Sequence, residues 1–160
     1  MTLTMKSDDC CTELTQGARK GNLHHDFETT EFRFIKLGSG GKWEAECIEG
    51  SLPCIRLGFR SNQHLECLQG DWDAVLRYWH EVEGRSRGKA TEYRNQIQQF
   101  YTLSPQTIWI TFYKRKLYWC RADSEVVELE DKTRIRKAIG GGWSSQDLNG
   151  NELYVDNLSG

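Results

Sequence analysis

Two runs of β-branched and aromatic residues, separated by three consecutive basic residues, constrain the fold of this chain more than any other feature. The runs occupy residues 107–113 and 117–122, and Lys114, Arg115 and Lys116 lie between them. Residues of these types favour strands, and a short polar break between two strands is typical of a tight turn. The sequence therefore predicts a β-hairpin with a basic turn at its tip.

The first of these runs has two chemically different sides. Alternation along a strand places Trp109, Thr111 and Tyr113 on one side and Ile108, Ile110 and Phe112 on the other. One side is aliphatic with a single ring, and the other is aromatic with hydroxyl groups. The second side suits packing under amphipathic helices, and it also suits a ligand site, so both roles remain open for Trp109.

The other elements follow from periodicity and from glycine or proline breaks. Strands are expected at 31–37, 54–59, 126–129 and 134–139, with a last short strand at 153–155, and helices at 43–48, 71–83 and 90–101. Glycines at 38–41 predict a turn, and those at 140–142 are expected to end the regular part. This order predicts an α+β domain whose mixed, barrel-like sheet is flanked by two or three helices.

The two longer helices each show an apolar stripe. Asp71 occupies the position of an N-cap, and Trp72, Val75, Leu76, Trp79 and Val82 after it follow helical spacing. In the second helix Tyr93, Ile97, Phe100 and Tyr101 share one side. Both stripes are expected to pack on the core.

Length and composition favour one globular domain. A chain of 160 residues with 38% hydrophobic residues and six Trp can bury a core without covalent cross-links. Residues 1–28 are polar and without period, so they are expected to form a flexible arm, with the domain at 29–160. No apolar run reaches the length of a membrane span, and no signal-peptide core is seen, so a cytoplasmic location is expected.

Cysteine usage gives no sign of a disulfide framework or of a metal site. The six cysteines include the adjacent pair Cys10 and Cys11, which suits no common framework, and reduced thiols are expected. His24 and His25 lie close to this pair, but zinc ligands normally come as spaced pairs such as C-x-x-C. We therefore expect neither a metal nor a cofactor.

Charge is distributed unevenly along the chain. Between Arg85 and Arg121 there are eight Lys or Arg and one acidic residue, so this stretch carries +7 although the whole chain carries −2. The same stretch has eight of the eighteen aromatic residues. Cationic groups beside ring surfaces suit the phosphates and bases of nucleic acid, although a solvated helix and ordinary core rings would explain either feature alone.

Candidate catalytic residues do not form a convincing set. Asp71, Asp73, His80 and Glu81 lie on or near one helix, but adjacent residues of a helix point in different directions. The glycines at 38–41 lack the spacing of a nucleotide-binding loop, although their N–H groups, beside Lys36 and Lys42, could hold one phosphate. The sequence therefore indicates a binding protein and not an enzyme.

Two stretches are similar to the PUA-like superfamily, and within it to EVE and YTH domains. The first is the strand at 32–37 with its loop, Trp43 and the short helix, and the second is 93–100 with the two hairpin strands. The resemblance implies a domain that binds nucleic acid and takes a modified base into an aromatic pocket. In bacteria such readers accompany defence nucleases, so it also implies an effector as partner. Ser104, Pro105 and Gln106 depart from the Gly-Asp usual before the first central strand.

These observations lead to a hypothesis about the site. DNA or RNA phosphates are expected to bind Arg85, Arg87, Lys89, Arg94, Lys114, Arg115 and Lys116. A flipped base is expected to lie between Trp43, Trp119 and Trp143, with Lys36 or Asn95 reading its edge. Two alternatives remain: a regulator whose basic aromatic face binds a protein, and a metal-independent ribonuclease of the ASCH type.

Overall fold

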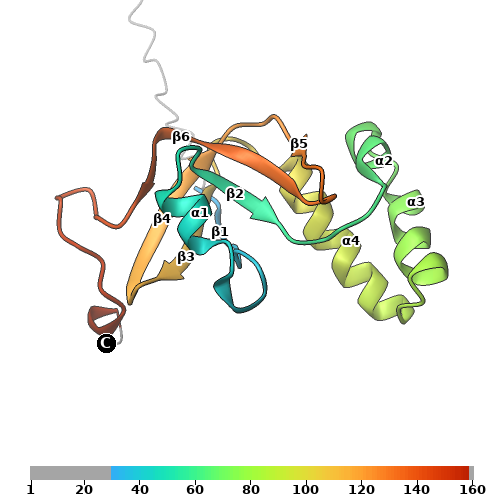
Figure 1. The fold of residues 1–160 in the computed structure, drawn as a ribbon, viewed down its shortest axis with the longest axis horizontal. Coiled ribbons are helices and arrows are strands. Elements are labelled where there is room, and N and C mark those ends of the chain that lie inside the picture. Colours follow the sequence, from blue (N-terminus) through green and yellow to red (C-terminus); the bar gives the residue numbers. More distant parts are fainter. Residues whose placement is uncertain (1–29, 159–160) are drawn as a thin grey trace, which may run out of the picture.

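The computed structural model describes residues 30–158, which form one mixed sheet with the helices of residues 64–102 gathered at one of its ends (Figure 1). The strand order is β1-β3-β4-β6-β2, and β5 pairs with β6. Only β1 and β3 pair in parallel, and every other strand pair is antiparallel. The α+β class expected from the sequence is confirmed. The arm predicted at 1–28 lies outside the described residues.

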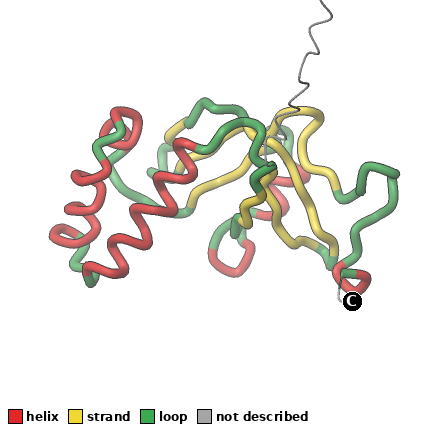
Figure 2. The backbone as a smooth tube through the Cα atoms, turned by 180° about the vertical axis from the view of Figure 1, so that it is seen from behind, coloured by secondary structure: helices red, strands yellow, loops and turns green. Residues whose placement is uncertain are grey.

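The elements run in the following order along the chain. They are β1 (Phe32–Phe34), η1 (Ser39–Gly41), α1 (Glu44–Glu49), β2 (Cys54–Leu57), α2 (His64–Gln69), α3 (Trp72–Arg77), η2 (Tyr78–Val82), α4 (Arg87–Thr102), β3 (Ile108–Tyr113), β4 (Lys116–Ala122), β5 (Val127–Glu128), β6 (Arg134–Ser144) and η3 (Val155–Asn157). Seen from behind, α2, α3 and α4 occupy one end and the loop after β6 the other (Figure 2). No helix within 30–158 has the length and apolar character needed to cross a bilayer.

The predicted hairpin is present as β3 and β4. Its two-residue turn consists of Lys114 and Arg115, which have φ angles of 47° and 60°. Positive φ at both central residues defines a type I′ turn, whose twist matches that of the strands but which L-residues other than Asn and Asp rarely adopt. The turn therefore has the backbone geometry that suits this hairpin, but Lys114 and Arg115 adopt it only at a cost in conformational free energy.

Replacing the turn by Asn-Gly should stabilise the protein. We expect the double variant Lys114→Asn, Arg115→Gly to raise the free energy of unfolding by about 1 kcal/mol, because it relieves two strained φ angles. The two surface ion pairs that it removes contribute little. Urea unfolding measures the difference. Lys116→Asn, one position into β4, is the control and should bring no gain; a double variant less stable than the parent would contradict this account.

The sheet is not closed into a barrel. β1 and β2 lie at its two ends and do not pair with each other. β1 has only three residues and pairs with β3 alone, and the chain turns away after Ile35. The barrel-like closure expected from the sequence is therefore not observed, because no backbone pairing joins the two end strands.

The sequence predicts that the glycine triplet ends the regular part of the chain, and this prediction is wrong. β6 continues through Gly140, Gly141 and Gly142, which have φ angles of 69°, 96° and 89°. Its register with β4 shifts between Trp119 and Arg121, so the glycines form a bulge inside the strand. The strand expected at 153–155 is also wrong, because only isolated bridges and η3 are found there.

The helical end differs from expectation in two ways. α2 has no counterpart in the sequence analysis, whereas Asp71 caps α3 as expected, its Oδ1 accepting from the N–H of Ala74 at 3.0 Å. The helix then changes to the π-helical segment η2, in which the N–H of Glu83 donates to the carbonyl of Tyr78 five residues earlier. The wider turn rotates Val82 out of the predicted apolar stripe, and it is 72% exposed.

Helix α4 joins the helical end to the sheet. Ser86 caps it, so it begins at Arg87, three residues earlier than expected. Ala90, Ile97 and Phe100 are buried on one side, and the Phe100 and Trp109 ring centroids lie 6.1 Å apart. Trp109 is only 4% exposed and therefore belongs to the core side of β3.

Arg136 on β6 lies at the centre of this junction. Its side chain is fully buried, and it donates to the carbonyls of Phe100 at 2.9 Å, Leu103 at 3.0 Å, Ala122 at 3.4 Å and Asp123. Burial lowers the pKa of the guanidinium, but an arginine keeps its proton in a protein. The charge is thus compensated by backbone carbonyls at the ends of α4 and β4, and the Asp123 carboxylate adds a Coulombic attraction without forming an ion pair.

Candidate functional site

Two adjoining cavities lie where the loop after β1, the end of β2 and helix α4 meet. The first, which we call the sheet cavity, has a volume of about 300 Å³ and is lined by Arg33, Lys36, Arg56, Gln96, Gln99 and Trp109 among others. The second, the helix cavity, has a volume of about 340 Å³ and is lined by Lys42, Trp43, Arg60, Trp79, Arg85 and Tyr93 among others. Volumes of this size match small-ligand sites.

The two cavities share one boundary. Gly38, Ser39, Gly58 and Phe59 line both of them. A Cβ at Gly58 would lie 3.4 Å from the Trp43 ring, and Gly38 has a φ of +86°, at which a Cβ would come within 2.8 Å of the Lys42 side chain. Because these glycines have no side chains, Trp43 and Lys42 can pack closely against the backbone that separates the two cavities.

The lining of both cavities is basic. Six cations line them, and none of the described lining residues is acidic. Arg33 pairs with Glu31, while Arg56 and Arg60 both contact Asp131, at 2.9 and 3.4 Å. The remaining three, Lys36, Lys42 and Arg85, make no ion pair with another described residue. These three charges are available to an anionic ligand.

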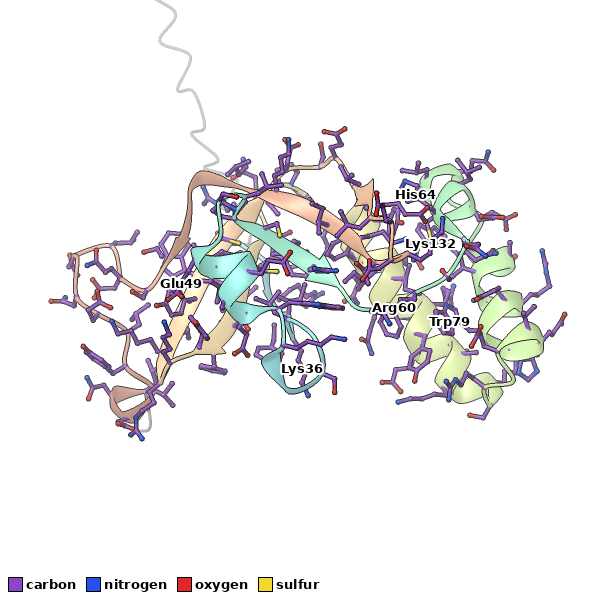
Figure 3. All side chains as sticks on the ribbon, viewed as in Figure 1. Lys36, Glu49, Arg60, His64, Trp79 and Lys132 are labelled. Carbon is purple, nitrogen blue, oxygen red and sulfur yellow. The ribbon has the colours of Figure 1, made fainter. Side chains whose placement is uncertain are left out.

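Aromatic rings form the wall of the helix cavity. The centroid of Phe59 lies 4.7 Å from that of Tyr93 and 5.7 Å from that of Trp79, and Trp79 and Tyr93 are 5.2 Å apart. Arg56 Cζ lies 4.1 Å from the centroid of Trp43. Figure 3 shows Trp79 among the helices and Arg60 between them and the loop that carries Lys36. Rings and cations therefore meet in one place.

Asp131 holds Arg56 in its position over Trp43. It accepts from the hydroxyl of Thr133 at 2.5 Å, from its N–H at 3.0 Å, and from Arg56 Nη2 at 2.9 Å. The pKa of Asp131 is lowered to about 2. The largest cause of this shift is the hydrogen bond from the Thr133 hydroxyl, and the charge of Arg56 adds to it. The carboxylate is thus ionised throughout the physiological range.

Because the pKa of Asp131 is lowered in the folded protein, the free energy of unfolding should decrease at low pH. The contribution is complete above about pH 4, the region of the unfolded pKa, and is lost as the pH falls towards 2. The Asp131 side chain is 36% exposed, so we expect solvent screening to limit the loss to about 1 kcal/mol. Urea unfolding of Asp131→Asn should show a flatter profile between these pH values, whereas Glu130→Gln, next to it, should follow the parent.

The residues predicted to bind phosphate are not gathered in one place. Arg85 lines the helix cavity, but Arg87 lines a different hollow together with Asp73 and Glu81. Lys89 Nζ pairs with Glu92 at 2.9 Å. Arg94 is half-buried on α4, and its Nε has no hydrogen-bond partner among the described residues.

The basic turn of the hairpin is neutralised locally. Lys114 pairs with Glu49 at 2.7 Å, Arg115 with Asp156 at 2.5 Å and Lys116 with Glu152 at 2.9 Å. Hydrogen bonds to these carboxylates raise the pKa of Lys114 and of Lys116. Glu49 lies on the side of the sheet away from Arg60 and Trp79 (Figure 3). This cluster is therefore separate from the cavities.

Of the predicted base pocket, Trp43 lines the helix cavity and Lys36 the sheet cavity. Trp119 lines another cavity, of about 370 Å³, which shares no residue with these two, and its N–H donates to the carbonyl of Gln146 at 2.8 Å. Trp143 donates to the carbonyl of Cys54 at 3.0 Å. Trp43 and Trp119 therefore cannot enclose the same base.

Asn95 is exposed and does not line either cavity, whereas Gln96 and Gln99, on the neighbouring positions of α4, line the sheet cavity. Arg56, Phe59, Arg60 and Trp79 were also missed as site residues. The helical stripe that begins at Tyr93 was the only signal in the sequence for Gln96, because positions three apart share a side of a helix.

The outer face of the β1-β3-β4 layer is apolar. Register places Phe32 beside Ile108 and Phe34 beside Ile110, on the side opposite Trp109. Phe34 is 63% exposed and Leu148, which lines the cavity under this face, is 96% exposed. The aliphatic side of the hairpin strand is therefore the one that faces outward.

The candidate metal-binding and catalytic side chains within residues 30–158 are not gathered at one site. No group of three or more His, Cys, Asp or Glu in this part is placed to hold a metal ion. His80 Nδ1–H donates to the carbonyl of Arg85 at 2.8 Å, and Asp71 serves as a cap. Cys47, Cys54, Cys67 and Cys120 are free and buried, as expected of small apolar residues. Cys10, Cys11, His24 and His25 lie outside the described residues.

Comparison of the chain with models of known protein families, with curated proteins and with solved structures gives no match.

Proposed function

We propose that this protein is a nucleic-acid reader that takes an unpaired or flipped base into the joined cavities. The observation that supports this most directly is the basic, ring-walled lining without an acidic residue. Phosphates attract cations, and every base has a face that stacks on aromatic rings. A site that combines both features suits a single strand or an extruded nucleotide.

Within this proposal the described residues have distinct roles. Lys42 and Arg85, at the helix cavity, contact phosphates, and Phe59 and Tyr93 provide stacking surface. Trp43 supports the site from beneath, because Arg56 and Lys42 lie over its ring at 4.1 and 4.5 Å from the centroid. Lys36 contributes a further cation at the sheet cavity. The PUA-like resemblance agrees with a base site beside Trp43, although the roles once expected for Trp119 and the hairpin turn are not part of this proposal.

Fluorescence anisotropy with labelled DNA and RNA strands tests the proposal. Affinity should fall as salt rises from about 50 to 200 mM, because binding releases counterions. Arg85→Ala should weaken binding and reduce the slope of log K against log salt by about 0.7 to 0.9. Arg115→Ala, which removes a cation of the paired hairpin turn, is the matched control and should bind as the parent does.

Three results would contradict the reader function. An affinity that does not change with salt would show that nucleic acid does not bind at the cavities. The same conclusion would follow if Arg115→Ala bound nucleic acid as weakly as Arg85→Ala. Cleavage of labelled RNA in the presence of a chelator would instead support the metal-independent ribonuclease.

A protein-binding role is the second candidate, and the apolar outer face favours it. Phe32, Phe34 and Phe112 are between 46% and 63% exposed on one sheet face. Contiguous apolar surface of this kind is typical of interaction sites. A co-purified partner that dissociates from Phe34→Ser but resists nucleic-acid competitor would support this role.

A further inference from the structure

We propose that the joined cavities hold two consecutive nucleotides of one strand, with one base in each cavity. This inference rests on the proposed function and specifies the ligand of the same site. It explains why the site has two compartments of similar volume, about 300 and 340 Å³, on either side of a low glycine boundary.

Each compartment has its own ring and its own free cation. The sheet cavity has Trp109 and Lys36, and the helix cavity has Trp43 and Lys42. The loop that carries both lysines also provides Gly38 and Ser39 to the shared boundary. The phosphate between two bases would lie at this boundary, where a cation is present on either side.

Each compartment also has a buried hydrogen-bond donor without an acceptor. Trp79, in the helix cavity, is 5% exposed, and Trp109, in the sheet cavity, is 4% exposed. The indole Nε1 of each has no hydrogen-bond partner among the described residues. Buried N–H groups are normally satisfied. Both nitrogens are closed to solvent in the free protein, so acceptors on a ligand would reach them only when the cavity walls shift on binding. Base carbonyl oxygens and ring nitrogens are such acceptors.

The two compartments differ in how they would recognise a base. Gln99 lines the sheet cavity, and its side-chain amide makes no hydrogen bond with a described residue, whereas Gln96 donates to Glu92 at 3.2 Å. A free amide can pair with the edge of a base, as Gln does with adenine. The helix cavity is walled by rings instead, which stack on any base. The sheet cavity is therefore the selective compartment.

Calorimetry with ligands of increasing length tests the two-nucleotide site. The probes are a nucleoside monophosphate, the corresponding dinucleotide and a decanucleotide, each in ribo and deoxyribo form. The dinucleotide should bind at least about tenfold tighter than the monophosphate, because a second base adds its own stacking. A free dinucleotide as tight as the decanucleotide would identify a small soluble ligand, whereas a much tighter decanucleotide would identify a strand.

Two conservative variants assign the compartments. Trp79→Phe and Trp109→Phe each keep a ring and remove a donor that has no partner among the described residues, so each should lower the melting temperature less than truncation to alanine does. Each should weaken the dinucleotide by about threefold to tenfold, the value of one hydrogen bond. The monophosphate should respond to only one of them. Trp119→Phe, whose N–H is already satisfied on the other sheet face, is the control and should leave both affinities unchanged.

The results separate this inference from the reader function. Decanucleotide binding with no gain from monophosphate to dinucleotide overturns the two-nucleotide site and leaves the reader function standing. An equal loss of monophosphate affinity in both Trp variants also overturns the two-nucleotide site, because both donors would then face one base. No binding of any probe overturns both proposals.

Discussion

Arg136→Ala is expected to lower the free energy of unfolding by about 3 to 5 kcal/mol, because it leaves a core cavity and buried carbonyls that lose their donors. The guanidinium is fully buried and donates to four backbone carbonyls. Alanine would leave these acceptors without donors and would open a cavity beside Trp109. Such a loss approaches the total stability of many domains of this size.

Two further variants make this result interpretable. Arg136→Lys keeps the charge but cannot reach carbonyls in four directions, so its loss should be intermediate. Arg121→Ala removes an exposed arginine from the neighbouring strand β4 and should change stability by less than about 0.5 kcal/mol. Urea unfolding followed by circular dichroism gives all three values. A loss at Arg136 as small as that at Arg121 would show that the carbonyls are satisfied in another way.

Trp79→Ala should have a comparable effect, a loss of about 3 to 5 kcal/mol, because it removes the largest buried ring of the helical end. Trp79 is almost fully buried and contacts Phe59, Tyr78 and Tyr93. These contacts connect η2 with α4 and with the residues after β2. Without the indole, the helical end loses the main apolar contact that joins it to the rest of the core.

Val82→Ala is the matched control for Trp79. Both residues belong to η2, and both were assigned to the same apolar stripe from the sequence, but Val82 is exposed. Its truncation should therefore cost less than about 0.5 kcal/mol. Thermal unfolding compares the two variants directly, and equal losses would mean that the segment is α-helical in solution.

The elements whose local chemistry is unambiguous were predicted correctly. The hairpin has β-branched strands and a polar break, and α4 has a regular apolar stripe at Ile97 and Phe100, so both follow from residues close in sequence. Val82 was wrong because a π-helical turn has no periodic signature distinct from that of an α-helix. The glycines at 140–142 were read as an end because an isolated sequence does not distinguish a bulge from a turn.

The candidate site depends on contacts between residues far apart in the chain, and for this reason it was predicted only in part. Lys36, Trp43 and Arg85 were identified from their own chemistry and lie at the cavities. Arg56 was missed because its role depends on Asp131, 75 residues later. The hairpin turn was expected to bind phosphate because Glu49, Glu152 and Asp156, which neutralise it, are distant in sequence.

The outward aliphatic side of β3 gives the molecule two chemically opposite fronts. Trp109 and the cavities face the helices, while Ile108 and Ile110 face away from them. A nucleic-acid ligand bound at the cavities would leave the apolar outer face of the sheet exposed. The two candidate roles therefore require opposite faces of the sheet and do not compete for the same surface.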